Sequence, residues 1–268
     1  MDHDHPGEPD SPACTSFLPP PSDLVLVEGT VHVWRASLDV PSTTLTTLTA
    51  YLSADEHVHA ERFHFDRDRR RFIVAHSFLR DVLSRYTGIP PAAIRFMVNP
   101  YGKPSLSTGY GVPPLYFNLS HSGEVALLGT AVGAEIGIDV ELIRPDVIKE
   151  GIAERFFAAA EVADLQALPE KLQADAFFHC WTRKEAYIKG RGIGLSLPLD
   201  RFEVTLRPDE PARLRRVMDL PEEPEAWSMH TIIPTPGYAG ALAVRSIVSQ
   251  PSCWNWAPPA RQQNDMIS

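Results

Sequence analysis

Three carboxylates in two separate segments are the residues of this sequence best suited to chemistry. Asp139 and Glu141 lie two residues apart in the otherwise apolar run 135–141, and Glu185 lies in the helical pattern 172–189. Side chains two residues apart on a strand point to the same face, so Asp139 and Glu141 present adjacent carboxylates that repel unless a cation sits between them. Two or three carboxylates with water are how proteins hold Mg²⁺ beside a phosphate. The pattern predicts a Mg²⁺-dependent reaction at a phosphate.

Each of these features also has an ordinary structural explanation. An Asp-x-Glu at the end of a strand is usually a solvated edge. Glu185 and Lys189 form an i, i+4 pair, which stabilises a helix by about 0.2–0.5 kcal/mol without any function. The chemical interpretation is favoured because two further motifs lie upstream.

Those two motifs supply groups that could hold a phosphate. Residues 101–104, Tyr-Gly-Lys-Pro, are a turn signal that places Lys103 on a short loop. Residues 117–122 run from an apolar segment into Asn-x-Ser-His-Ser. A lysine, a hydroxyl and an imidazole that can become cationic near neutral pH make a phosphate clamp. Ser120 and His121 face opposite ways on extended chain, so they do not form a nucleophile–base pair, and the sequence has neither a Gly-x-Ser-x-Gly elbow nor a Gly-x4-Gly-Lys-Ser/Thr loop.

Taken in order, these motifs resemble those of the Sfp-type 4′-phosphopantetheinyl transferases. They are Tyr-Gly-Lys-Pro, Phe-Asn-Leu-Ser-His-Ser, Gly-Ile-Asp-Val-Glu and Trp-Thr-Arg-Lys-Glu-Ala-Tyr-Ile-Lys-Gly, the last followed by Gly-Leu-Ser-Leu-Pro-Leu, and the resemblance covers roughly residues 31–245. Members of this family move the phosphopantetheine arm of coenzyme A onto a serine of a carrier protein and release adenosine 3′,5′-bisphosphate. The resemblance therefore implies an enzyme, a holo-[carrier-protein] synthase.

The resemblance also implies roles for individual residues. Asp139, Glu141 and Glu185 would hold Mg²⁺, and Glu185 would act as ligand, general base or both. Lys189 and His121 would stabilise charge on the transferring phosphoryl group and the departing bisphosphate. Arg62 and Arg71 fall where the family holds the 3′-phosphate, although Glu56 and His59 stand where the best-known members carry lysines. The full set expected to contact coenzyme A is Arg62, Arg71, Lys103, Pro104, Asn118, Ser120, His121, Asp139, Glu185 and Lys189.

Two other functions remain as alternatives to this transferase. One is a non-catalytic protein that binds coenzyme A or a carrier domain, and the three carboxylates and two motif lysines speak against it. The other is a Mg²⁺-dependent pyrophosphate hydrolase, which usually shows a denser acidic helix. The product separates the three, because a hydrolase releases free 4′-phosphopantetheine, a transferase leaves it on protein and a binder does neither.

The expected partners are coenzyme A and apo acyl or peptidyl carrier proteins. Fatty-acid, polyketide and peptide-synthetase carriers all present a serine at the start of a helix, so the pathway stays open. Carriers of this kind are generally acidic, and the net charge of −9 would repel them at long range. Docking is therefore expected to use a local basic patch of Arg183, Lys184 and Arg191, supplemented by apolar contact near residues 192–197.

Length and composition agree with a cytoplasmic enzyme that acts as a monomer. The 268 residues are 44% apolar, enough to fill a sizeable core, and the net charge argues against binding nucleic acid. The three cysteines have no zinc-binding spacing, and their odd, scattered count is typical of a reducing cytosol. No apolar run is long enough to span a membrane, and the start of the chain does not resemble a signal peptide.

The pattern of apolar residues predicts an α+β fold of two similar halves related by a pseudo-two-fold, each with a long helix packed on a small mixed or antiparallel sheet. The expected domains are a disordered tail 1–23, an N-terminal half 24–133, a C-terminal half 134–248 with the metal site, and a loose tail 249–268. Residues 53–56 resemble a helix start with a capping box. Helices are expected at 45–52, 66–86, 145–157, 159–168 and 172–189, and strands at 25–38, 94–98, 115–119, 125–132, 136–142, 202–206, 227–233 and 239–247.

Overall fold

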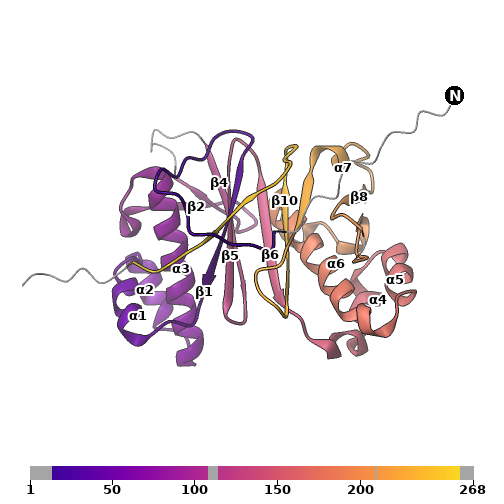
Figure 1. The fold of residues 1–268 in the computed structure, drawn as a ribbon, viewed down its shortest axis with the longest axis horizontal. Helices are drawn as coiled ribbons and strands as arrows, with labels where there is room; N and C mark the ends of the chain where they lie inside the picture. The colour runs from indigo at the N-terminus through magenta and orange to yellow at the C-terminus, as the bar shows by residue number, and fades with distance from the viewer. Residues whose placement is uncertain (1–13, 108–113, 209, 260–268) are drawn as a thin grey trace, which may run out of the picture.

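Two sheets stand side by side at the centre of the molecule, with helices on their outer flanks (Figure 1). The structure, a computed structural model, describes residues 14–107, 114–208 and 210–259. The larger sheet has the order β11 (Ser252–Asn255), β1 (Val31–Ser37), β5 (Val125–Val132) and β4 (Leu115–Ser122). The smaller sheet has the order β6 (Ile136–Leu142), β10 (Tyr238–Val244) and β9 (Ser228–Ile232). All pairings are antiparallel except that of β1 with β11.

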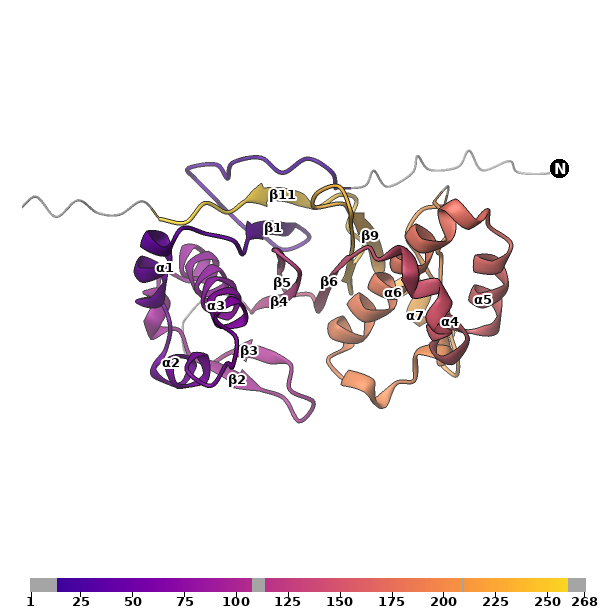
Figure 2. The same cartoon turned by 90° about the horizontal axis from the view of Figure 1, so that it is seen from below.

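The N-terminal half places its helices against the larger sheet. These are α1 (Ser42–Thr49), α2 (Ala54–Ala60) and α3 (Asp66–Thr87). The predicted capping box is confirmed, because Ser53 accepts from the Glu56 amide while Glu56 binds the Ser53 amide. A short helix η1 (Pro91–Ala93) leads into the hairpin of β2 (Phe96–Val98) and β3 (Pro104–Leu106). Figure 2 shows this hairpin extending toward the C-terminal half.

The C-terminal half is organised around the long helix α6 (Glu170–Arg191). One side of α6 packs on β6 and β10, and the other is covered by shorter elements, so residues all round the helix are buried. The predicted helix 145–157 is divided, because Gly151 adopts a left-handed conformation with φ +64°. The covering elements are η2 (Pro145–Glu150), α4 (Ile152–Phe156), α5 (Ala159–Gln166), η3 (Gly194–Ser196), η4 (Leu199–Arg201), β7 (Phe202–Val204), β8 (Leu214–Val217) and α7 (Glu223–Ala226).

Each half has its own core, and a third apolar cluster lies where the two sheets meet. It includes Val33, Leu127, Ile138 and Leu242, all fully buried. The two halves are therefore one packed body, and the predicted α+β fold of two halves is confirmed. No helix in the described ranges combines the length and apolar character that a membrane span requires.

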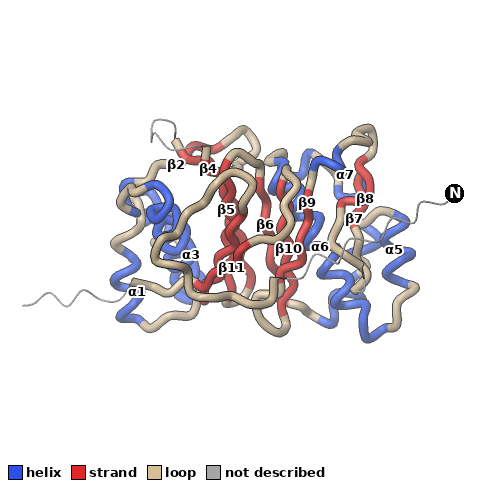
Figure 3. The backbone as a smooth tube through the Cα atoms, turned by 45° about the horizontal axis from the view of Figure 1, so that its top comes forward, coloured by secondary structure: helices blue, strands red, loops and turns tan. Residues whose placement is uncertain are grey.

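Both ends of the described chain cross from one half to the other. β11 pairs with β1, beside which it lies in Figure 2, and Figure 3 shows β11 as a strand over the larger sheet. The expected loose tail 249–268 is therefore wrong for residues 252–255, and residues 260–268 lie outside the described residues. Near the other end, Cys14 pairs with Ile232 on β9 and Leu18 pairs with Trp254 on β11. Residues 14–18 lie in the segment predicted to be disordered, yet they are ordered. They pair with backbone groups of the edge strands β9 and β11, one in each sheet. The expectation for residues 1–13 lies outside the described residues.

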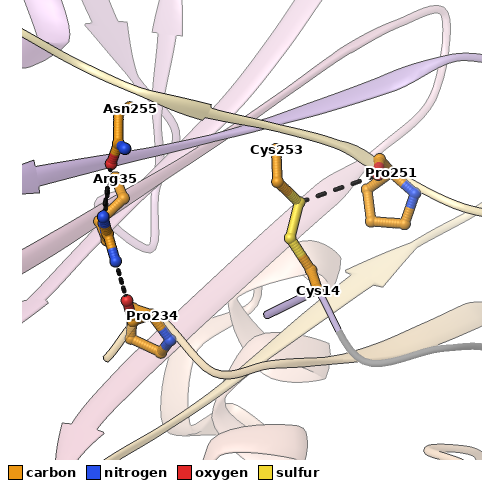
Figure 4. The surroundings of a disulfide bond; sticks show 6 residues. All are labelled: Cys14, Arg35, Pro234, Pro251, Cys253 and Asn255. Carbon is orange, nitrogen blue, oxygen red and sulfur yellow. Dashed lines mark hydrogen bonds between the residues drawn. A yellow bond between two sulfur atoms is a disulfide. The ribbon is translucent and has the colours of Figure 1, made fainter. Parts of the chain in front are cut away.

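A disulfide between Cys14 and Cys253 fastens this crossing (Figure 4). The two cysteines are separated by 239 residues in sequence, and only Cys180 is a free, buried thiol among the described cysteines. Two of the three cysteines are therefore paired, although an odd, scattered count is typical of a reducing cytosol. Sequence spacing gave no sign of the pair, because it depends on β11 returning to the first sheet.

Candidate active site

The two sheets are joined at β4 and β6 by polar side chains rather than by a strand ladder. Alternate residues of β4 point at β6, as the two-residue period of a strand requires. Ser120 Oγ donates to Asp139 Oδ1 at 2.9 Å, and Ser122 Oγ donates to Glu141 Oε2 at 2.8 Å. Two steps earlier, Asn118 Oδ1 accepts from the amide of Ile138 at 2.9 Å. The N-terminal half thus orients both carboxylates of the C-terminal half.

Lys189 completes a small network around Asp139. Its Nζ lies 2.5 Å from Asp139 Oδ1 and donates to Ser120 Oγ at 3.0 Å. Asp139 is buried, and its second oxygen, Oδ2, has no hydrogen-bond partner in the part of the chain that the structure describes. Burial raises the pKa of Asp139, and the nearby Lys189 ammonium works against that rise. One oxygen of this carboxylate is therefore engaged, and the other is buried without a hydrogen-bond partner among the described residues.

The other two carboxylates share the same electrostatic environment. Burial raises the pKa of Glu141, and the charge of Asp139 raises it further, while the hydrogen bond from Ser122 lowers it. The pKa of Glu185 is raised by burial and then by the charges of Asp139 and Glu141, whereas Lys189 lowers it. A bound cation would relieve this repulsion, because it favours the charged form of each neighbouring carboxylate.

The carboxylates suit a hard cation by their chemistry. Among the described residues, however, no three His, Cys, Asp or Glu side chains are already gathered in a metal-binding group. The open Oδ2 of Asp139 is the observation that supports a cation here, because a buried oxygen without a partner is costly. Asp139, Glu141 and Glu185 remain the predicted ligands, in agreement with the preference of Mg²⁺ for carboxylate oxygen.

Close approach of α6 to β6 brings the two groups of acids together. Gly137 lies two residues before Asp139 on the same face of β6, and a Cβ at this position would stand 2.0 Å from the carbonyl oxygen of Ala186. On the helix, a Cβ at Gly190 would stand 2.7 Å from the Trp227 ring. Only glycine at these positions lets α6 lie so close to the strand, and Glu185 and Lys189 are carried on the same turns.

A cavity of about 240 Å³ opens beside these residues. It brings together five of the residues predicted from the motifs, namely Lys103, Pro104, Asn118, Glu185 and Lys189. The Lys103 ammonium is nevertheless engaged with the main chain, because it donates to the carbonyls of Gly190 at 2.6 Å and Ile136 at 3.1 Å. Burial lowers the pKa of Lys103 to about 8, against the charge of Glu135. Its predicted contact with a phosphate stays a prediction.

A second group of side chains lies around His121, the residue that follows Ser120 on β4. Its ring is exposed, but the surrounding protein lowers the pKa of His121, and the charges of His76, Lys189 and Arg71 lower it further. Arg71 is half-buried and stands 3.8 Å from a Glu124 carboxylate that is 64% exposed. We call the group of Arg71, His76, His121 and Lys189 the His121 cluster, because the other three interact electrostatically with His121.

The structure also places two residues of the region expected to hold the 3′-phosphate, Arg62 and Glu56. Arg62 lies exposed just after α2, and nothing in the described part of the chain ties it to the His121 cluster. Glu56, at a position of a family lysine, holds Arg80 at 2.6 Å and His76 at 2.9 Å. His76 and Ser122 were missed as site residues. Ser122 could have been found from its two-residue spacing to Ser120, whereas no local signal marks His76.

The predicted basic docking patch is wrong. Arg183 is 2% exposed, and its guanidinium donates to the Thr205 carbonyl at 2.7 Å. Lys184 is fully buried and pairs with Glu161 at 2.7 Å. Arg191 donates to Glu223 at 3.0 Å. A docking patch would need an exposed face of α6 at these residues. Shorter elements cover that face, so Arg183 and Lys184 are buried.

Comparison with known proteins gives two adjoining family matches. Residues 135–243 match the model described as the 4′-phosphopantetheinyl transferase superfamily, and residues 34–133 match the one described as 4′-phosphopantetheinyl transferase, N-terminal. The chain is 38% identical over 241 residues to 4′-phosphopantetheinyl transferase HetI of Nostoc sp., covering 90% of this chain and 98% of that protein. It is 35% identical over 193 residues to 4′-phosphopantetheinyl transferase Sfp of Bacillus subtilis, covering 72% and 82% respectively.

Proposed function

Because the chain belongs to the 4′-phosphopantetheinyl transferase superfamily, we propose that it transfers the phosphopantetheine arm of coenzyme A to a serine of an apo carrier protein, with Mg²⁺. One observation carries the proposal. Asp139 and Glu141 from β6 interact electrostatically with Glu185 from α6, and Oδ2 of Asp139 is buried without a hydrogen-bond partner among the described residues. A protein that only bound coenzyme A would gain nothing from three mutually repelling carboxylates.

Asp139, Glu141 and Glu185 would hold the metal. When bound, Mg²⁺ would neutralise charge on the pyrophosphate of coenzyme A and orient the phosphorus that is attacked. Ser120 and Ser122 position the carboxylates for this purpose, since each donates to one of them. The two serines lie in the N-terminal half and the carboxylates in the C-terminal half. The geometry of the site therefore depends on the relative position of the two halves.

Glu185 is the proposed general base. Its pKa is raised by burial and by two neighbouring acids, which makes its carboxylate a better proton acceptor than an ordinary one. It would take the proton of the carrier serine as the serine oxygen bonds to the β-phosphorus. The bond from that phosphorus to the bridging oxygen breaks, and adenosine 3′,5′-bisphosphate leaves.

Lys189 and the His121 cluster supply positive charge for this step. The Lys189 ammonium lies next to Asp139 and is 30% exposed, so it can reach a phosphoryl oxygen at the mouth of the cavity. Arg71 would add a guanidinium, and His76 and His121 would add imidazoles, as hydrogen-bond donors to the phosphates of the departing bisphosphate. Phosphoryl transfer relies on positioning and charge stabilisation of this kind.

The deciding experiment mixes the protein with several apo carrier domains, coenzyme A and Mg²⁺, and follows intact mass. A carrier that gains the phosphopantetheine arm supports the proposal, and chelation of the metal should stop the gain. Glu185→Gln should lose transfer, whereas Glu170→Gln, an exposed acid at the start of the same helix, should keep it. Free 4′-phosphopantetheine without a modified carrier would instead indicate a hydrolase, and no product with intact binding would indicate a binder.

A further inference from the structure

The β2–β3 hairpin of the N-terminal half touches the end of the helix that carries Glu185 and Lys189. From its tip, the Lys103 ammonium donates to the Gly190 carbonyl at 2.6 Å and the Asn99 side-chain amide donates to the Gly192 carbonyl at 2.7 Å. Both acceptors lie at the C-terminal end of α6. The hairpin therefore contacts the active-site helix without belonging to its half of the protein.

These contacts supply hydrogen-bond donors to carbonyl groups at the C-terminal end of α6. The last four carbonyls of a helix have no partner within it, and they carry partial negative charge. Gly190 is among the last residues of α6, which ends at Arg191, and Gly192 follows with φ +64°. A lysine ammonium and an amide N–H are suitable donors for such carbonyls. Lys103 and Asn99 thus cap α6 from across the junction between the halves.

The hairpin tip is built to hold Lys103 in place. Asn99 Oδ1 accepts from the amides of Tyr101 and Lys103, both at 2.9 Å, and Gly102 turns the chain with φ +87°. A Cβ at Gly192 would lie 2.7 Å from Cδ of Lys103, so glycine there makes room for the lysine stem. The tip and the helix end are therefore complementary in shape as well as in hydrogen bonding.

The second acceptor of Lys103 links the cap to the carboxylates. Its Nζ also donates to the carbonyl of Ile136 at 3.1 Å, three residues before Asp139 on β6. One ammonium therefore joins the strand that carries Asp139 to the helix turn that carries Lys189. This junction adjoins Gly137, where α6 and β6 make their closest approach.

We propose that Lys103 and Asn99 form a clasp that positions α6 against β6, and that Lys103 acts on catalysis through this clasp rather than by binding a phosphate of coenzyme A. The inference rests on the proposed function for its activity readout. Lys103 and Asn99 are positioning residues, since their donors are directed at the main chain. Two of the three N–H groups of the Lys103 ammonium are used by carbonyls, so a phosphate would have to compete with both.

The test removes the ammonium with Lys103→Met, which keeps most of the stem. If the clasp positions α6, kcat should fall by about 100-fold while KM and Kd for coenzyme A change by less than about twofold. Lys171→Met, an exposed lysine on the same helix, should change neither. A loss of coenzyme A affinity by about tenfold or more with kcat retained would overturn the proposal and make Lys103 a phosphate ligand.

Asn99→Asp is a second variant that separates the two explanations. An aspartate keeps an oxygen for the two tip amides but loses the donor to Gly192, and Asn99 has no predicted contact with a phosphate. The clasp requires kcat to fall here also, and unchanged kcat would overturn it.

A third measurement does not need activity. Hydrogen exchange of the amides in residues 186–192 should speed up in Lys103→Met and in Asn99→Asp, and stay unchanged in Lys171→Met. If the wild-type protein transfers nothing to any carrier, the proposed function fails, while faster exchange still supports the clasp. Unchanged exchange in both variants would overturn the clasp whatever the activity.

Discussion

The Lys189 ammonium lies 2.5 Å from one oxygen of Asp139, and the other oxygen of that buried carboxylate meets no donor within the described ranges. The two sides of Asp139 are thus unequal. One oxygen contacts a lysine from α6, and the unpartnered oxygen is where the proposed metal ion would bind.

Metal binding should be visible as a gain in stability. Burial raises the pKa values of Asp139, Glu141 and Glu185, and the charges of neighbouring acids raise those of Glu141 and Glu185 further. These acids therefore oppose folding once they ionise, and the stability of the protein without metal falls as pH rises through the raised pKa values. Mg²⁺ should offset this, by about 1.4 kcal/mol at about ten times its Kd. A thermal melt should show a larger Mg²⁺ shift near pH 7.5 than at lower pH, because protonation of the acids competes with the metal and their raised pKa values favour that protonation.

The matched variants for this melt are Asp139→Asn and Asp175→Asn. The first removes the open carboxylate and should abolish the Mg²⁺ shift. The second changes an exposed aspartate on α6 and should leave the shift intact. A full shift in Asp139→Asn would show that the metal binds elsewhere.

Glu185→Gln should stop transfer without harming the fold. Loss of a general base typically costs about 10²–10⁴ in rate. The melting temperature should hold or rise, since the substitution removes a charge that repels Asp139 and Glu141. The check is single-turnover transfer beside a thermal melt, with Glu170→Gln as control. Transfer within a few-fold of wild type would exclude Glu185 as the base.

His121→Ala should weaken binding of coenzyme A. The lost charge-assisted hydrogen bond is worth about 1.5–3 kcal/mol if the ring is cationic when the ligand is bound. Calorimetric titration measures this directly, and His64→Ala, an exposed histidine whose ring contacts Phe65, serves as control. Dephospho-coenzyme A, titrated in parallel, should lose less affinity if His121 faces the 3′-phosphate. Equal affinities for wild type and variant would remove His121 from the site.

Gly137→Ala should damage both stability and transfer. The added methyl would stand 2.0 Å from the Ala186 carbonyl oxygen, so α6 must move away from β6. Overpacking of this kind costs about 1–3 kcal/mol. Denaturant unfolding should be compared with Gly129→Ala, where the methyl would meet the flexible end of Ile136 at 2.9 Å. The predicted role of Gly137 fails if its variant keeps wild-type transfer.

The Cys14–Cys253 disulfide should stabilise the oxidised protein. It closes a loop with a sequence separation of 239 residues, and bonds of this kind contribute about 2–4 kcal/mol. Cys14→Ser should therefore unfold at lower denaturant than wild type under oxidising conditions, and the two should coincide once a reductant is added. If they coincide without reductant as well, the bond contributes no net stability.

Local patterns in the sequence were enough to predict the main helices and the acidic motifs. The apolar period of residues 66–86 and the spacing of Ser53 and Glu56 depend only on neighbouring residues, and both are confirmed by α3 and the capping box of α2. The two-residue spacing of Asp139 and Glu141 likewise determined that both point to one face of β6. Such features are set by backbone geometry over a few residues.

Contacts between distant segments were decided only by tertiary packing. Lys184 has the sequence context of an exposed helix charge, yet it is buried because a second layer covers α6. Lys103 sits in a motif that suggests a free lysine, yet its ammonium caps a helix from the other half. The pairing of Cys14 with Cys253 depends on both chain ends crossing between the sheets. The partner of a side chain depends on which segments pack together in the fold. The spacing of residues along the chain does not determine which distant segments these are.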